Sequence, residues 1–192
     1  MQVRTSGRAL LRGSVKNEYT GAAWRDAASG RRYLFVNPRF AALRRNLFDQ
    51  ARPGRELRES YLSGETITVL MRADTVSTLY LTQRFSSLAG EGIVPYFSPA
   101  SEVFGTRSLA AGDSYTFTGS LTTASTPGVR ELVLAAAGAG DPYLDTVLET
   151  YTTFPSSVGA EVIALAKRVA SQAETDFDRA SALCNYLQSA YP

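Results

Sequence analysis

Apolar and polar positions alternate most regularly near the middle of the chain. Within residues 114–121, Tyr115, Phe117 and Gly119 fall on one face, and serine and threonine residues occupy the positions between them. A period of two is typical of a strand that is buried on one side. Asp113, which follows an Ala-Gly pair, supplies turn chemistry just before it. The pattern therefore predicts a half-buried strand over these residues.

Four further runs also predict strands, and all but the first of them are rich in β-branched or aromatic residues. They cover residues 9–15, 32–36, 66–71 and 78–81. Turn residues separate them, including Ser29-Gly30 before the second run and Ala73-Asp74 before the fourth. Several short strands with turn signals between them are typical of a β-sandwich or a partial barrel.

A helix is predicted after Asn37-Pro38, because Asn is a good N-cap and Pro is a good first helical residue. Four apolar residues then share one helical face, and Arg52-Pro53-Gly54 ends the pattern. The apolar face consists of Phe40, Leu43, Leu47 and Phe48. We expect this helix to be an insertion that covers one face or edge of the strands.

The pattern changes after about residue 127. Residues 134–141 are small and indicate a linker or a helix end, and two helical patterns follow. The first has Val158, Val162, Leu165 and Val169 at helical spacing, and the second starts from Thr175 as N-cap. The second predicts one buried stripe made of Phe177, Ala180, Cys184, Leu187 and Tyr191.

These patterns together predict an α+β fold in two parts. Residues 1–127 form a β-rich, sandwich-like domain with an inserted helix. Residues 128–192 form a linker and a C-terminal pair of helices. With 192 residues, of which 44% are hydrophobic, the chain is long enough to bury a core without disulfides or metals.

Charge is unevenly distributed. Residues 1–58 carry 13 Arg and Lys against 4 Asp and Glu, a net charge of +9, whereas the rest of the chain is acidic. Such a division either marks an anionic partner for the basic part or reflects solvation and attraction between the two parts.

Catalytic chemistry is restricted because the chain contains no histidine and only one cysteine, Cys184. Ser-His-Asp and Cys-His catalysis are therefore excluded within this chain, as are nearly all zinc sites. Since Cys184 lies in the apolar stripe, we expect it to pack as a small hydrophobic residue. There is no glycine-rich phosphate loop and no EF-hand loop, so we expect no cofactor or metal.

Two features remain open as sites. Acidic pairs such as Glu56 with Glu59, or Asp176 with Asp178, are candidates for acid–base work, but acids near in sequence usually solvate a surface or cap a helix. The basic part also contains Tyr19, Trp24, Arg25 and Tyr33, which are candidates for a ligand surface that stacks sugars. The alternative is that these aromatics fill the core. We expect no nucleic-acid partner.

Several short motifs resemble one bacterial family, the membrane-anchored transglutaminase-like proteins that are often described as cysteine proteases. The first part of the chain contributes Leu11-Arg12-Gly13, Tyr19-Thr20-Gly21 and Trp24-Arg25-Asp26. The last part contributes Asp141-Pro142-Tyr143-Leu144, Phe154-Pro155, Asp178-Arg179-Ala180, Tyr186-Leu187 and Tyr191-Pro192. The segment 151–155 occupies the place of the family's proline segment, with its leucines replaced.

The resemblance implies an extracytoplasmic protein, tethered to the membrane in its full-length form. It also implies that residues 128–192 include the first helices of a transglutaminase-like core. The family's catalytic cysteine, histidine and aspartate lie beyond the second helix, so no catalytic residue is carried over, Cys184 included. The fragment itself is then not an enzyme, whereas its parent is.

Three hypotheses follow. In the first, the β-rich domain is a structural or recognition module beside an active site supplied by later residues of its own chain. Its basic part would suit a cell-envelope polymer or the membrane surface. In the second, the chain is a stand-alone extracellular binding module for glycans or anionic cell-envelope polymers. In the third, it is an enzyme that uses carboxylates. The helical stripe is a candidate surface for a homodimer.

Overall fold

The computed structural model describes residues 1–26, 30–48, 64–121, 126–137, 145, 148–149 and 151–191. The chain folds into two compact units. One, the β unit, contains Met1–Asn17 and Asp26–Thr126; the other, the helical unit, contains Glu18–Arg25 and Pro127–Pro192. The fold is α+β, as the sequence predicts. The assignment of Glu18–Arg25 to the helical unit was not indicated by the sequence.

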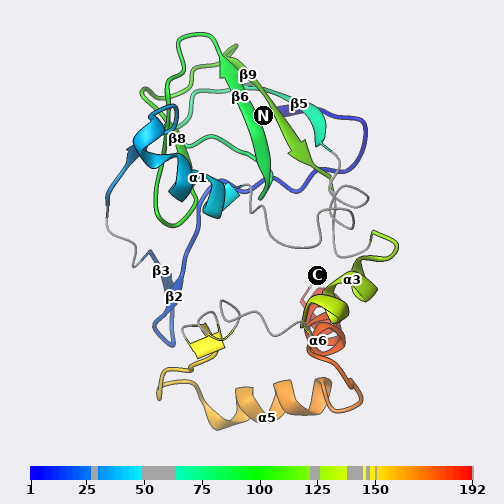
Figure 1. Ribbon diagram of the computed structural model, residues 1–192. Coiled ribbons are helices and arrows are strands. Elements are labelled where there is room, and N and C mark those ends of the chain that lie inside the picture. The colour runs from blue at the N-terminus through cyan, green and yellow to red at the C-terminus, as the bar shows by residue number, and fades with distance from the viewer. Residues whose placement is uncertain are drawn as a thin grey trace. The chain divides into compact units, whose positions relative to one another are not determined.

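The β unit contains a four-stranded antiparallel sheet with the order β1-β5-β9-β6 (Figure 1). Its strands are β1 (Gln2–Arg4), β5 (Gly64–Leu70), β6 (Phe85–Gly90) and β9 (Ser114–Ser120). The alternation predicted for β9 is confirmed, because Tyr115, Phe117 and Gly119 are buried and the residues between them are not. Ile67 and Val69 of β5 are fully buried on the same side.

A second, three-stranded antiparallel sheet has the order β4-β7-β8. Its strands are β4 (Tyr33–Leu34), β7 (Pro95–Phe97) and β8 (Val103–Gly105). The prediction for residues 32–36 is therefore confirmed at the centre of the run. One hydrophobic core joins residues of both sheets: Phe48, Ile67, Val69, Met71, Leu79, Leu81, Phe85, Phe97, Val103, Leu109, Tyr115 and Phe117.

The inserted helix is confirmed. A 3-10 helix, η1 (Pro38–Phe40), leads into α1 (Ala41–Phe48), and the Asn37 side chain accepts a hydrogen bond from the backbone N–H of Arg39 at 2.9 Å. Phe48 is buried in the core, with Phe40, Leu43 and Leu47 packed beside it. The predicted stop at residues 52–54 lies outside the described residues.

Two strand predictions are wrong. Residues 9–15 form no strand, because only Arg12 pairs in a ladder, through an isolated bridge to Leu81. Residues 78–81 likewise form only isolated bridges: Thr78 pairs with Phe104, and Leu81 pairs with Arg12. Neither segment is continuously paired: Leu79 and Leu81 are buried without a regular ladder, whereas Leu11 and Val15 are only partly buried and Leu10 is exposed. Leu79 and Leu81 still belong to the core.

The helical unit contains the hairpin of β2 (Glu18–Tyr19) and β3 (Trp24–Arg25), and helices whose bounds fall within the described residues follow it. The helices are α3 (Val129–Ala137), α5 (Ala160–Val169) and α6 (Asp176–Ala190). The helical prediction around α5 is confirmed, as is the Thr175 cap, whose hydroxyl accepts from the Asp178 N–H. Of the two alternatives for residues 134–141, a linker or a helix end, the second fits α3, which ends at Ala137 because alanine favours the helix up to that point. Residues 138–141 lie outside the described residues.

The buried stripe predicted on α6 is wrong. Cys184, Leu187 and Tyr191 are exposed, and so is Ala180. The partly buried positions of α6 instead include Ala182, Leu183 and Tyr186, on the face that meets α3 and α5. The helix is thus rotated about its axis relative to the prediction, and Cys184 is not a core residue. Within the described ranges, no helix is long and apolar enough to cross a membrane.

Candidate functional site

Tyr19 and Trp24 form a cross-strand pair on the β2–β3 hairpin of the helical unit. They are directly opposite in the register, and their ring centroids lie 5.1 Å apart at an interplanar angle of 37°. The Tyr19 hydroxyl donates to the carbonyl of Gly21 at 2.9 Å, which holds the ring against the turn. The Trp24 residue is 61% exposed. Two of the predicted ligand residues, the half-buried Tyr19 and the exposed Trp24, therefore form one aromatic surface, here called the aromatic face.

Arg25 belongs to the same hairpin but to its other side, because successive residues of a strand point to opposite faces. Its register partner is Glu18, and the two side chains form an ion pair of 2.5 Å. The hydrogen bond from Arg25 lowers the pKa of Glu18, and the same bond raises the pKa of Arg25. The guanidinium is thus engaged within the hairpin, and the aromatic face is formed by Tyr19 and Trp24 alone.

The turn of this hairpin contacts the segment that precedes α5. Gly21 has φ +93°, and a Cβ built on it would lie 1.8 Å from Oγ of Ser157 and 3.7 Å from Cβ of Pro155. The Ser157 hydroxyl donates to the carbonyl of Thr20 at 3.4 Å. Only glycine combines this conformation with so close an approach. A turn near the start of the chain is therefore fitted against residues that follow much later.

Tyr33 lies in the β unit, so it belongs to a different body from the aromatic face. It is half-buried, and its ring centroid lies 4.7 Å from that of Phe40 and 5.5 Å from that of Phe97. Tyr33 therefore packs in the aromatic part of the core, which was one of the two alternatives for these aromatic residues. Trp24 lies on an exposed surface, which was the other.

Arg12 anchors the first segment of the β unit. Its backbone exchanges two hydrogen bonds with Leu81, and its guanidinium donates to the carbonyl of Ser101 at 2.6 Å and to the Gln83 side chain. Burial lowers the pKa of Arg12, and the nearby carboxylate of Glu102 opposes that shift. These bonds give Arg12 a structural role, because each of them connects the first segment of the β unit to another part of the same unit.

Glu102 was not singled out by the sequence. It is 9% exposed, accepts a hydrogen bond from the Val15 N–H at 2.9 Å, and contacts the Ser98 hydroxyl. It therefore ties the segment that follows Arg12 to the β7–β8 connection. A single glutamate in a loop belongs to no repeating apolar pattern, so the sequence cannot predict that it is buried, and only the fold reveals it.

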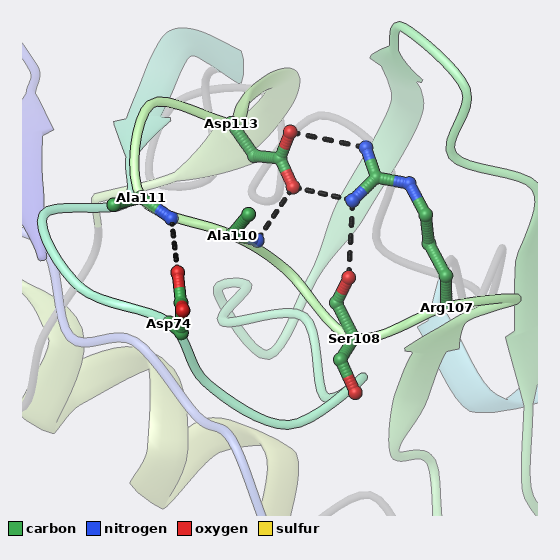
Figure 2. A network of polar contacts seen from close by, with 6 residues as sticks. All are labelled: Asp74, Arg107, Ser108, Ala110, Ala111 and Asp113. Atoms are coloured by element: carbon green, nitrogen blue, oxygen red, sulfur yellow. Dashed lines mark hydrogen bonds and ion pairs between the residues drawn. The ribbon is translucent and has the colours of Figure 1, made fainter.

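Acidic side chains elsewhere are engaged in turns and caps. Figure 2 shows Asp113 between the guanidinium of Arg107, at 2.5 and 3.0 Å, and the N–H of Ala110, while Asp74 accepts from the N–H of Ala111. The hydrogen bond from Arg107, with help from Ala110, lowers the pKa of Asp113 to about 2. This network fixes the turn before β9.

The acids proposed for acid–base work do not converge. Asp178 accepts from Arg130 of α3 at 2.7 and 3.0 Å and caps α6 through Thr175, and the bond from Arg130 lowers its pKa to about 2. Asp176 pairs with Arg179 on the surface. Glu56 and Glu59 lie outside the described residues. Across the part of the chain that the structure describes, no three Cys, Asp or Glu side chains are placed to hold a metal ion.

Comparison of the chain with protein-family models, with curated proteins and with solved structures found no match.

Proposed function

We propose that this chain is the non-catalytic front part of a larger, transglutaminase-like protein. The observation that carries the proposal is the contact between Gly21 and Ser157. Tyr19-Thr20-Gly21 and Phe154-Pro155 are two of the motifs on which the family resemblance rests, and they are far apart in the sequence. That the two motifs lie together in one unit supports reading them as parts of one structural arrangement rather than as separate short coincidences.

In this proposal the helical unit is the beginning of the catalytic core, and later residues of the parent protein supply the cysteine, histidine and aspartate. The exposed apolar side chains of the unit support this role, because they leave a surface for further structure to cover. They include Val162 of α5, Leu187 of α6 and Tyr191, which are 55%, 54% and 70% exposed. The β unit is then a structural or recognition module on the outer side of the membrane to which the parent is tethered.

The test is to read the native coding sequence on both sides of these 192 codons. The proposal expects membrane-spanning segments upstream, and a cysteine, a histidine and an aspartate, in that order, downstream. A stop codon directly after Pro192 would overturn it. So would a downstream region that lacks any one of the three residues, because the active site would then be incomplete.

A second candidate function is favoured by the exposure of the aromatic face. In this reading the chain is an extracellular module that binds glycans or anionic cell-envelope polymers, with sugar rings stacked on Trp24. Aromatic rings combine a large apolar surface with low conformational cost on binding. Because Trp24 is the only tryptophan, its fluorescence reports on this face without labelling.

We would titrate the 192-residue chain with soluble cell-wall glycan fragments and follow the Trp24 emission. Saturable quenching or a blue shift is expected if sugars stack there. Trp24→Phe keeps an aromatic surface and should retain binding in a pull-down on insoluble cell wall, whereas Trp24→Ala should lose it. Equal retention of both variants, or no spectral change, rules out this role for the aromatic face.

A further inference from the structure

One corner of the β unit concentrates positive charge. The described residues from Gly30 to Phe48 contain five arginines and no acidic residue. Four of the five are exposed, and Arg44 is half-buried. We call this surface the α1 corner; it comprises β4, η1, α1 and the adjoining ring of Phe104, and its arginines are Arg31, Arg32, Arg39, Arg44 and Arg45.

Two of these arginines are held in place by aromatic rings. The guanidinium carbon of Arg32 lies 4.0 Å from the centroid of Phe104, and that of Arg44 lies 4.9 Å from the centroid of Phe35. Arg44 also donates to the carbonyl of Phe35. Stacking fixes the direction of a planar cation but leaves its charge uncompensated, so less side-chain freedom is lost when an anion binds.

No carboxylate in the described part of the chain forms an ion pair with any arginine of the α1 corner. This differs from other arginines of the protein, such as Arg107, which is paired with Asp113. The acid nearest in sequence to Phe104 is Glu102, which is buried and bonds to Val15 and Ser98. Among the described residues, the positive charge of the corner is therefore not compensated by a carboxylate, and four of its five arginines are exposed.

The same segment also exposes apolar side chains, at sequence positions between those of its arginines. Val36, in the connection from β4 to η1, is 65% exposed, and the neighbouring Pro38 is exposed as well. A soluble polyanion would need only the charges. A bilayer interface provides phosphates for the arginines and an acyl boundary for a protruding apolar side chain.

We propose that the α1 corner binds the surface of a bilayer that contains anionic phospholipid. The headgroup phosphates would contact Arg31, Arg39 and Arg45, and Val36 would enter the interface between them. This goes beyond the function proposed above and does not depend on it. The family assignment is tested by the coding sequence, and the membrane surface is tested with vesicles, so that either can fail alone.

The experiment is co-sedimentation of the 192-residue chain with vesicles of phosphatidylcholine, with or without a third of phosphatidylglycerol. Binding is expected only to the anionic vesicles, and it should weaken as salt rises because exposed charges are screened. Each basic residue near such a surface contributes about a fivefold increase in partition. The double variant Arg39→Glu with Arg45→Glu should therefore bind at least about tenfold more weakly.

The matched control is Arg4→Glu with Arg8→Glu, which changes the net charge equally on exposed residues at the β1 end of the β unit. It should bind much more tightly than the α1-corner variant. Equal loss in both pairs would show attraction by net charge alone and overturn the proposal.

A second variant distinguishes a bilayer from a soluble anion. Val36→Ala leaves the charge unchanged and should weaken vesicle binding severalfold, while leaving any binding of inorganic polyphosphate unaffected. If Val36→Ala binds the vesicles as well as the original chain does, and polyphosphate displaces the protein completely, the corner is a polyanion site and the bilayer proposal is wrong.

Discussion

At the scale of single residues, Tyr115 shows how a side chain replaces a missing ladder. The segment that contains Leu79 and Leu81 is buried but is not continuously paired with a strand. The hydroxyl of Tyr115 accepts from the N–H of Tyr80 at 2.7 Å and donates to the carbonyl of the same residue at 3.1 Å. One hydroxyl therefore satisfies both backbone groups of Tyr80, and burial of that hydroxyl raises the pKa of Tyr115.

Replacing Tyr115 by Phe should destabilise the β unit by about 1–3 kcal/mol, because both backbone groups of Tyr80 lose their partner. Urea unfolding followed by circular dichroism would measure the free energy of unfolding. Tyr96→Phe is the control, since Tyr96 is only partly buried and no hydrogen bond of its hydroxyl occurs within the described residues. Equal losses for the two variants would contradict the role given to Tyr115.

The carboxylate of Asp113 makes the turn before β9 sensitive to acid. Its pKa is about 2 in the folded protein and lies near 3.9 in an unfolded chain. A depressed pKa contributes stability that is complete above the unfolded value and is lost as the pH falls through the folded value. Asp113→Asn should therefore lower the thermal midpoint at pH 7, and the difference from the original chain should shrink between pH 4 and pH 2.

Thermal unfolding at a series of pH values would test this expectation. Glu91→Gln serves as the control, because this substitution also removes one carboxylate and Glu91 is exposed. It should change the midpoint little at any pH. If Asp113→Asn keeps a constant deficit down to pH 2, the ion pair with Arg107 is not the source of its effect.

At the scale of elements, the sequence predicted those with a repeated period or a strong cap. The alternation of β9, the Asn37 cap before α1 and the Thr175 cap before α6 all appear as predicted. The strands β1, β7 and β8 were missed because three residues cannot display a period. For α6 the period was correct but the buried face was not, because which face packs depends on α3 and α5 and not on the helix itself.

The candidate site was predictable only in part. The sequence proposed Tyr19 and Trp24, and the hairpin brings them together as the aromatic face, on which Trp24 is exposed and Tyr19 is half-buried. It could not reveal that Tyr33 belongs to another body, or that the hairpin turn fits against Ser157. That contact joins residues 137 positions apart, and no local pattern carries such information.

Gly21→Ala tests that contact at the level of the element. The new Cβ would collide with Ser157, and the positive φ alone costs about 1–2 kcal/mol for a residue with a side chain. The hairpin should detach at a lower urea concentration, and the fluorescence of Trp24 would report the midpoint.

Two other glycines separate the cost of the positive φ from the cost of the collision with Ser157. Gly112 has φ +94° with open space for a Cβ, so Gly112→Ala measures the cost of the backbone conformation alone by circular dichroism. Gly30 also has open space, and its φ lies outside the positive range, so Gly30→Ala should have little effect. A loss for Gly21→Ala no larger than that for Gly112→Ala would mean that the contact with Ser157 contributes nothing.

At the scale of the whole molecule, the exposed apolar surface of the helical unit is the property that the proposed function must explain. Cys184 lies on it and is exposed, so it is a natural probe. In this 192-residue chain Cys184 should react with a thiol reagent almost as fast in the native state as in denaturant, and Cys184→Ser should give no signal. A longer form that includes the downstream residues should protect it.

Protection of Cys184 in the 192-residue chain itself would contradict that expectation. Repeating the reaction over a range of protein concentrations identifies the cause. Protection that grows with concentration would show that a second copy covers the α6 surface, as in the predicted homodimer. Protection at every concentration would place the thiol inside its own chain.

The assignment of Glu18–Arg25 to the helical unit has a consequence for synthesis on the ribosome. The chain passes from one unit to the other three times, so no single cut yields both units complete. The hairpin is translated well before Ser157, which follows Thr20 by 137 positions. At about 5–20 residues per second, the hairpin waits roughly 7 to 26 seconds for its partner. During that interval the hairpin turn lacks its contact with Ser157, and the order of translation delays completion of the helical unit until its last helices emerge.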